Sequence, residues 1–224
     1  MLILLIVLAL AIFVLPNLWA KWVLKRHTRG RDDYPGTGAE LAEHLIRRMG
    51  MEGVRVERTE QGDHYDPEAR CVRLTPDHYD GRSLTAVTVA AHEVGHAIQH
   101  HEGYAPLLAR SRLVQVAQKA EKLGAILMMA APFLFLLTRL PGGLAMIVVM
   151  AVISFGTAAL VHLVTLPVEF DASFNRALPL LKEYVPPADM AGARHVLTAC
   201  AFTYVAASLA SVMNLGRWLV ILRR

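Results

Sequence analysis

The sequence predicts a mainly α-helical membrane protein, with about four transmembrane or membrane-embedded helices and one small α+β domain. Hydrophobic residues make up 54% of the 224 residues and charged residues only 19%, which is more apolar than an ordinary soluble domain. The apolar residues form long uncharged blocks, whereas most of the acidic residues fall within 32–122. Long apolar blocks are typical of segments that cross a bilayer, so the polar stretch is the candidate soluble domain.

The cysteines and the net charge of +4 argue against two other classes. Cys71 lies in a polar region and Cys200 in an apolar one, and this pattern does not indicate a disulfide framework. The basic residues cluster beside the apolar blocks and do not alternate with aromatic residues. We therefore expect no nucleic-acid partner.

The first apolar block, residues 1–20, is predicted to be a transmembrane anchor. At about 1.5 Å per residue it is long enough to cross a hydrocarbon core of ~30 Å. A cleavable signal peptide would carry a basic residue before the apolar run, and this chain has none there. Basic residues follow the block instead, at Lys21, Lys25, Arg26, Arg29 and Arg31. The positive-inside rule then predicts a multi-pass protein of the inner (plasma) membrane, with its N-terminus outside and its polar domain in the cytoplasm.

The polar domain, 21–122, is expected to combine helices with short strands. Hydrophobic periodicity and turn residues predict a helix over 37–49, strands over 54–56 and 71–74, and a helix over 83–101. Ser83 would cap the last of these helices. An apolar stripe along that helix should be buried and should leave the opposite face directed towards a cleft.

Three segments follow the polar domain. They are a membrane helical hairpin over 123–166, a helix over 167–184 and a membrane helix over 188–224. Because a hairpin returns the chain to the side it left, 167–184 should lie on the same side of the membrane as the polar domain. The lengths of 123–138 and 195–216 allow either a full crossing or a shallower insertion.

The motif His92-Glu93-Val94-Gly95-His96 lies within the predicted helix 83–101. Residues four apart lie on one helix face, so both imidazoles can bind one metal ion. In this H-E-x-x-H arrangement of zinc peptidases, the glutamate is the general base on a zinc-bound water. The small α+β domain is therefore predicted to be zincin-like and catalytic. A helical glycine costs about 1 kcal/mol relative to alanine, so Gly95 indicates close packing.

A catalytic zinc site has three protein ligands and one open position. A metzincin would continue with Gly at position 99 and His at 102, whereas this chain has Gln99 and Glu102. The remaining option is a glutamate on a separate helix. Glu169 is the best candidate, because the hairpin would place it on the side of His92 and a carboxylate ending an apolar helix needs a partner. Asp171 is the nearest rival, but on a helix it points roughly 200° away from Glu169.

Three motifs together resemble the YugP-like neutral zinc metallopeptidase family of small bacterial membrane proteins. They are Asp63-His64-Tyr65-Asp66-Pro67, the segment 89–99 around the histidines, and the segment 166–173. The arrangement is also similar to the HtpX/Ste24 class of membrane gluzincins, in which the ligand glutamate begins an E-x-x-x-D pattern. The resemblance implies Zn²⁺ as cofactor and Glu169 as ligand. Ser173 stands where that class has its aspartate.

The expected function is zinc-dependent endopeptidase activity at the cytoplasmic membrane face. His92, His96 and Glu169 would bind one catalytic Zn²⁺, and Glu93 would be the general base. The substrate would be a polypeptide, by resemblance a membrane or membrane-associated protein, in contact with the lipid bilayer. The strand 71–74 could accept an extended peptide by edge pairing. Residues that could stabilise the transition state or orient the ligands are His64, Tyr65, Ser173, Arg194, His195 and Tyr204.

Two other classes remain open from the sequence. One is a non-catalytic membrane protein with a structural zinc site, which would close its fourth coordination position and would not need Glu93. The other is a membrane scaffold or transport protein in which the short motif is coincidental.

Overall fold

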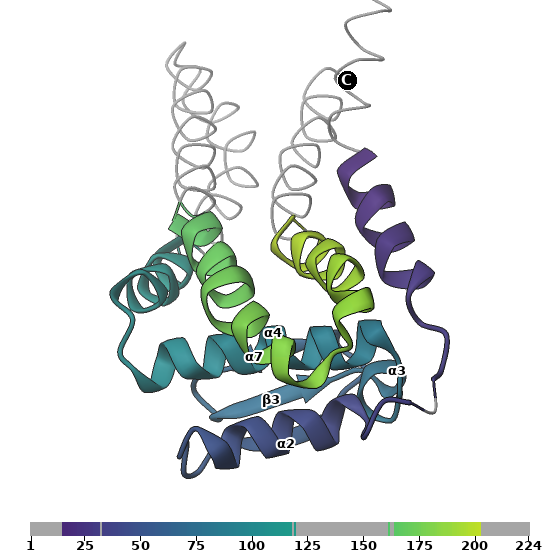
Figure 1. Ribbon diagram of the computed structural model, residues 1–224. Coiled ribbons are helices and arrows are strands. Elements are labelled where there is room, and N and C mark those ends of the chain that lie inside the picture. The colour runs from purple at the N-terminus through teal and green to yellow at the C-terminus, as the bar shows by residue number, and fades with distance from the viewer. Residues whose placement is uncertain (1–14, 32, 118, 120–160, 162–163, 203–224) are drawn as a thin grey trace, which may run out of the picture.

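The computed structural model describes residues 15–31, 33–117, 119, 161 and 164–202 (Figure 1). This part of the chain is mostly helical and contains one small sheet. Its central element is the helix α4, Leu84–His101. The sheet and the helix α2 lie on one side of α4, and the later helices of the chain lie on the other (Figure 1).

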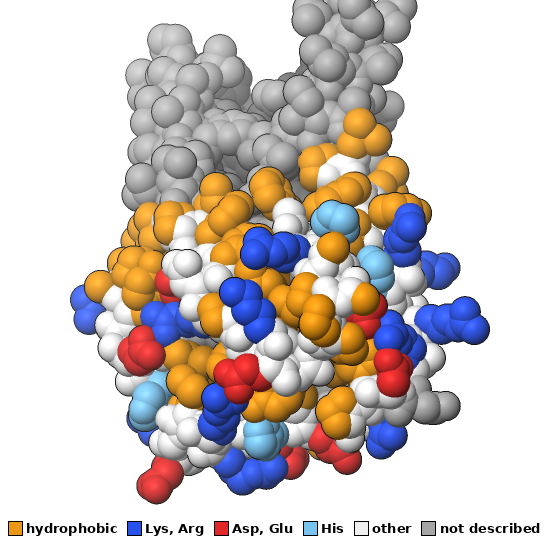
Figure 2. Space-filling view, in the orientation of Figure 1, with side chains coloured by type: hydrophobic (Ala, Val, Ile, Leu, Met, Phe, Trp, Pro, Cys, Tyr) orange, Lys and Arg blue, Asp and Glu red, His pale blue; other side chains and the backbone are white. Residues whose placement is uncertain are grey.

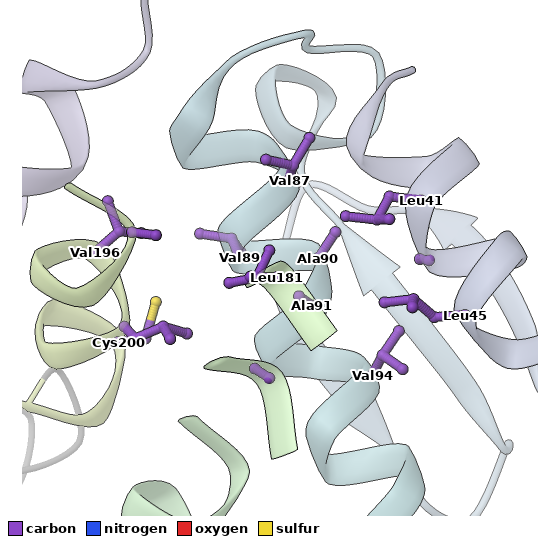
Figure 3. Packing of buried hydrophobic residues seen from close by; sticks show 14 of the residues in the cluster. Leu41, Leu45, Val87, Val89, Ala90, Ala91, Val94, Leu181, Val196 and Cys200 are labelled. Atoms are coloured by element: carbon purple, nitrogen blue, oxygen red, sulfur yellow. The ribbon is translucent and has the colours of Figure 1, made fainter. Parts of the chain in front are cut away.

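The first helix of the polar domain, α2, spans Gly38–Arg48. Thr37 caps its N-terminus: the Glu40 backbone N–H donates to the Thr37 hydroxyl, and the Thr37 N–H donates to the Glu40 carboxylate. This reciprocal capping box satisfies two backbone donors that a helix start leaves unpaired. Figure 3 shows Leu41 and Leu45 of α2 facing α4. The helix predicted over 37–49 is confirmed.

The sheet has three strands in the order β1-β3-β2. They are β1, Arg55–Arg58, β2, His64–Asp66, and β3, Cys71–Leu74. β1 pairs with β3 in parallel and β2 pairs with β3 antiparallel. β3 is therefore the central strand, and the expectation that it accepts an extended peptide by edge pairing is wrong. The sequence predicted β1 and β3 but not β2, which lies in a turn-rich stretch.

A short helix, α3, spans Pro76–Tyr79 and leads into α4. The Ser83 side chain accepts a hydrogen bond from the Ala86 N–H and caps α4, as the sequence predicts. Every residue of α4 from Leu84 to Gln99 is buried. One side of α4 packs on α2 and β3, and Figure 3 shows Val196 and Cys200 on the other side. Other helices thus cover much of the histidine face, while Glu93 and His96 still line a cavity, as the sequence predicted.

The later part of the chain forms a continuous helical segment with a changed pitch in its middle. Residues 164–170 are α-helical, Asp171–Ala177 form the π-helix η1, and Leu178–Tyr184 form α7. In η1 the Leu178 N–H donates to the Ser173 carbonyl, five residues back instead of four. A short 3₁₀ turn, η2, Pro187–Asp189, precedes a helix over 190–202. η1 packs directly on α4.

The fold class predicted from the sequence is wrong in its membrane part. In the residues that the structure describes, no helix is both long and apolar enough to cross a membrane. The described part of the first apolar block and the basic residues after it form a helix over 15–26 that contains Lys21, Lys25 and Arg26. This finding also overturns the predicted location as a multi-pass inner-membrane protein with a cytoplasmic domain. Most of the predicted membrane segments, 1–14, 120–160 and 203–224, lie outside the described residues.

Charged side chains are spread over most of the described face in the space-filling view, whereas hydrophobic side chains gather at its upper end (Figure 2). The exposed large hydrophobic residues on the helices over 15–26 and 164–170 are Leu15, Leu18, Trp19, Trp22, Leu166 and Phe170. The end of the described surface that is formed by these two helices is therefore more apolar than the rest of this face (Figure 2).

Candidate metal centre

Three buried side chains from two helices converge on one point. His92 and His96 lie one turn apart on α4, and Glu169 lies on the helix over 164–170. Glu169 Oε2 is 3.3 Å from His92 Nε2 and 3.2 Å from His96 Nε2. The exposed fractions of His92, His96 and Glu169 are 2%, 5% and 0%. The structure thus brings together the three ligands that the sequence predicted.

The two helices touch at Gly95. A Cβ built on Gly95 would lie 2.6 Å from the carbonyl oxygen of Ala172 and 3.2 Å from its carbonyl carbon. No side chain fits at that distance, so the packing reason that the sequence predicted for Gly95 is confirmed. This close approach brings Glu169, one turn before Ala172, over the two histidines.

The His92 ring is oriented by Ser173. Ser173 Oγ lies 3.0 Å from His92 Nδ1, and its hydroxyl donates to the Leu197 carbonyl at 3.3 Å. Because the hydroxyl hydrogen is directed to Leu197, the oxygen is available to accept a hydrogen bond from the Nδ1–H group of His92. His92 Nε2 then presents a lone pair towards Glu169.

The His96 ring is oriented by Gln99, one turn further along α4. Gln99 Oε1 lies 3.0 Å from His96 Nδ1. An amide oxygen can only accept a hydrogen bond, so Nδ1 carries the proton and Nε2 presents a lone pair. Both histidines therefore show the tautomer that a metal ligand requires.

The donor atoms fit a metal ion. Two imidazole lone pairs face one carboxylate oxygen at 3.2–3.3 Å, an arrangement that is repulsive unless a cation lies between them. Ligand atoms in a tetrahedral site with bonds of about 2.0–2.1 Å lie roughly 3.3–3.4 Å apart. The candidate ligand atoms all lie within 4.8 Å of one another. Two histidines and one glutamate are also a ligand set of catalytic zinc sites with an open fourth position.

The second oxygen of Glu169 faces a cation. Glu169 Oε1 is buried and accepts no aligned hydrogen bond from the described residues. Arg110 Nη1 lies 3.2 Å from it, so the contact is an ion pair in which the donor hydrogens are poorly directed. Burial raises the pKa of Glu169, but His96 and His92 outweigh it and hold the pKa well below its usual range, through the charge and the hydrogen bonds that they supply when Nε2 carries a proton in place of a metal ion. The Glu169 carboxylate is therefore ionised at neutral pH.

Glu93 stands next to the candidate ligands. It is 6% exposed, and it lines a cavity of about 300 Å³ together with His96, Arg110 and Tyr65. Burial raises the pKa of Glu93 to about 7, and the negative charge of Glu169 adds to the rise while His92 opposes it. The carboxyl group is thus buried at the edge of an open space.

Of the other residues singled out in the sequence, His64 and Tyr65 lie near the site on β2. Tyr65 lines the cavity, and its hydroxyl is 2.8 Å from His100 Nδ1. His64 Nδ1 is 2.8 Å from the Gly62 carbonyl, a local turn contact. Of these two residues, Tyr65 lines the cavity beside Glu93 and His64 does not.

The structure does not bring Arg194 and His195 to the candidate ligands. Both are exposed on the helix over 190–202, and His195 lines a separate cavity with Trp19 and Trp22. Tyr204 lies outside the described residues.

Sequence reasoning missed two residues beside the candidate ligands, Gln99 and Arg110. Gln99 follows His96 by one helical turn, and this i, i+3 spacing was a usable signal. Arg110 gave no comparable signal, because the helix over 105–117 reaches the site only after the chain turns back at Gly103. Asp171 Oδ2 accepts a hydrogen bond from Gln99 Nε2 at 2.8 Å. Asp171 therefore contacts the residue that orients His96 and is not itself one of the candidate ligands.

A helix with two histidines and an adjacent glutamate, completed by a glutamate from a second helix, defines the zinc peptidase class with a His₂Glu site. The chain belongs to the family described as "Putative neutral zinc metallopeptidase", whose model matches residues 2–223. It is 38% identical over 212 residues to the Bacillus subtilis (strain 168) protein named "Putative membrane protease YugP", covering 92% of this chain and 91% of that protein. No solved structure matches the chain.

The family predicted from the three sequence motifs is thus confirmed. Membership implies zinc as the metal and polypeptides as substrates, and His92, His96 and Glu169 are placed to bind a metal ion.

Proposed function

We propose that this protein is a zinc-dependent endopeptidase. His92, His96 and Glu169 bind one catalytic Zn²⁺, and Glu93 is the general base. The observation that carries the proposal is the convergence of these three donor groups beside a cavity of about 300 Å³ that Glu93 also lines. A purely structural zinc site would be closed and would leave Glu93 without a role.

When bound, the zinc ion supplies Lewis acidity towards the substrate carbonyl and lowers the pKa of water towards ~7. Glu93 accepts a proton from the attacking water and passes it to the amine that leaves. Tyr65 and Arg110 line the same cavity and are the donors available to the carbonyl oxygen as it gains charge. They replace Arg194 and His195, which face elsewhere.

The substrate chain is expected to lie along β2. Among the described residues β2 has one paired neighbour, β3, so its other edge has backbone groups that an extended peptide can pair with. Tyr65 on β2 and Pro67 just after it line the cavity beside Glu93. A peptide on this edge would therefore pass close to the general base.

The test separates metal binding from catalysis. Purified protein is expected to contain close to one zinc per chain and to cleave fluorescently labelled casein. Glu93→Gln should keep the zinc and lose cleavage by at least about a hundredfold, the lower end for a general base. Glu60→Gln, an exposed acid outside the site, should retain both properties. Undiminished cleavage by Glu93→Gln, or a wild-type protein that binds no zinc, would disprove the proposal.

A further inference from the structure

We infer that Gln99 is a positioning residue that fixes His96 for metal binding, through a relay that continues to Asp171 and Arg176. The inference rests on the proposed function, because it concerns the support of the proposed metal site. Neither the family model nor the relative's name assigns a role to these three residues.

The amide of Gln99 is held in one orientation. Its Nε2 donates to the Val168 carbonyl and to Asp171 Oδ2, both at 2.8 Å. Gln99 is fully buried, so no water can replace these partners. Rotating the amide by 180° would direct its oxygen at two acceptors and its NH₂ group at His96. Gln99 Oε1 must therefore face His96 Nδ1.

Asp171 is held in turn by two side chains of η1, and one of these is also bound to the end of α4. Arg176 Nε donates to Asp171 Oδ2 at 2.7 Å, and Asn175 Nδ2 donates to Asp171 Oδ1 at 2.9 Å. Arg176 Nη1 also donates to Glu102 Oε2 at 2.7 Å. Glu102 is the residue that ends α4. The relay therefore begins at the end of α4, passes through Arg176 and Asp171 of η1, and reaches His96 on α4 through Gln99.

The two histidines differ in how firmly their tautomer is fixed. The hydroxyl of Ser173 donates to the Leu197 carbonyl at 3.3 Å, but it can rotate about its Cβ–Oγ bond and would then donate to His92 Nδ1 instead of accepting from it. The amide oxygen of Gln99 can only accept, and its orientation is fixed by the relay. Gln99 is consequently the support that commits His96 Nε2 to the metal. Groups that orient a histidine ligand typically contribute 10–100-fold to metal affinity.

The test measures zinc affinity by chelator competition, together with the visible spectrum of the Co²⁺ form and the unfolding temperature of the metal-free protein. Gln99→Leu is expected to weaken zinc binding about 10–100-fold and to change the Co²⁺ spectrum. Gln99→Glu keeps the size of the side chain but places a carboxylate against Asp171 and the Val168 carbonyl, so it should also weaken binding. Gln61→Leu, at an exposed position, should change neither readout.

Two variants of Asp171 test the relay itself. Asp171→Asn retains an oxygen that accepts from Gln99 and Arg176, and zinc affinity should stay within about threefold of wild type. Asp171→Leu removes that acceptor, and it should resemble Gln99→Leu. If Gln99→Leu does not fold, the contrast between Asp171→Asn and Asp171→Leu and the result for Gln99→Glu decide the question.

Wild-type zinc affinity and an unchanged Co²⁺ spectrum in both Gln99 variants would overturn the inference and leave the proposed function standing. A lower unfolding temperature without a change in affinity or spectrum would show a purely structural role, and it would overturn the inference equally. A wild-type protein that binds neither zinc nor Co²⁺ would disprove the proposed function and the inference together.

Discussion

Arg110 Nη1 lies 3.2 Å from Glu169 Oε1, the carboxylate oxygen that does not face the two histidines. Glu169 is fully buried and Arg110 keeps about a fifth of its side chain in contact with solvent, at 18%. In the metal-free protein, Arg110 is thus a cation that stabilises an otherwise buried negative charge. The zinc ion proposed to bind Glu169 Oε2 would provide a second positive charge.

Removal of the Arg110 charge should destabilise the metal-free protein more than the zinc-bound protein. Breaking a buried pair costs about 3–5 kcal/mol, and the partial exposure of Arg110 reduces the expected loss for Arg110→Met to about 2 kcal/mol. Zinc should restore part of that loss, because it supplies positive charge to the same carboxylate. Urea unfolding with chelator and with zinc measures the difference. Arg112→Met, at an exposed position on the same helix, is the control. Equal losses in both conditions would contradict the prediction.

Gly95→Ala should damage both stability and metal binding. The new methyl group would meet the Ala172 backbone at 2.6 Å, so α4 and η1 must move apart. Overpacking of this kind costs about 1–3 kcal/mol, and it should displace Glu169 from the histidines and weaken zinc binding. Gly30→Ala is the matched control, since its nearest neighbour would be 4.0 Å away. Thermal unfolding and zinc titration of both variants check this expectation, which fails if Gly95→Ala binds zinc like wild type.

Ser173→Ala tests the orientation of His92. The hydroxyl is the group 3.0 Å from His92 Nδ1, and its removal should weaken zinc affinity about tenfold. Ser111→Ala removes a hydroxyl that donates to the Leu107 carbonyl of its own helix, and it should have no such effect. Chelator competition measures both. Identical affinities in the two variants would show that Ser173 does not support His92.

Zinc removal should lower the stability of the wild-type protein. A ligand present at about a thousand times its dissociation constant stabilises the native state by about 4 kcal/mol. Chelator treatment should therefore lower the unfolding temperature, and re-addition of zinc should restore it. Glu169→Ala should show a much smaller response to zinc, because one of the three ligands is lost. An equal response in wild type and Glu169→Ala would exclude Glu169 as a ligand.

Asp63 should contribute to stability at mildly acidic and neutral pH. Burial raises the pKa of Asp63, but hydrogen bonds from His78 and Thr75 outweigh it and bring the pKa below its ordinary value. A carboxyl whose pKa is lower in the folded state stabilises the protein above its unfolded pKa of ~3.9, and this contribution is lost as the pH falls through the folded pKa. Asp63→Asn should flatten the decline of stability below about pH 4. Urea unfolding across that range measures the slope, and an unchanged slope would refute the assignment.

The parts of the fold with strong local signals could be predicted from the sequence. α2 has an apolar stripe and a glycine, Gly50, after its end, and α4 has a Ser cap and a long periodic pattern, so both helices were predicted nearly to the residue. β2 was missed because its three residues lie among Gly, Asp and Pro, and only pairing with β3 makes them a strand. The burial of the histidine face could not be foreseen either, since η1 arrives from a distant part of the chain.

The site shows the same division between local and distant information. Glu169 could be predicted because a lone acid after an apolar run needs a partner. Arg110 was missed because its partner Glu169 comes from a separate helix, whereas the spacing of Gln99 from His96 on α4 was a local signal that was not used. The membrane prediction failed for a different reason. It was drawn from the hydrophobicity of whole blocks, and in the described part of the chain no helix is both long and apolar enough to cross a membrane.

The π-helix η1 makes the length of its segment as important as its composition. A turn with one extra residue lets Ser173 contact His92 while Asp171, two positions earlier, contacts Gln99. Deletion of a single residue such as Asn175 would favour a regular α-helix and rotate everything beyond it by about 100°. All three proposed zinc ligands would still be present in such a chain, yet α7 would no longer match the surface of α4. Sequence comparisons that score only the ligands would overlook that loss.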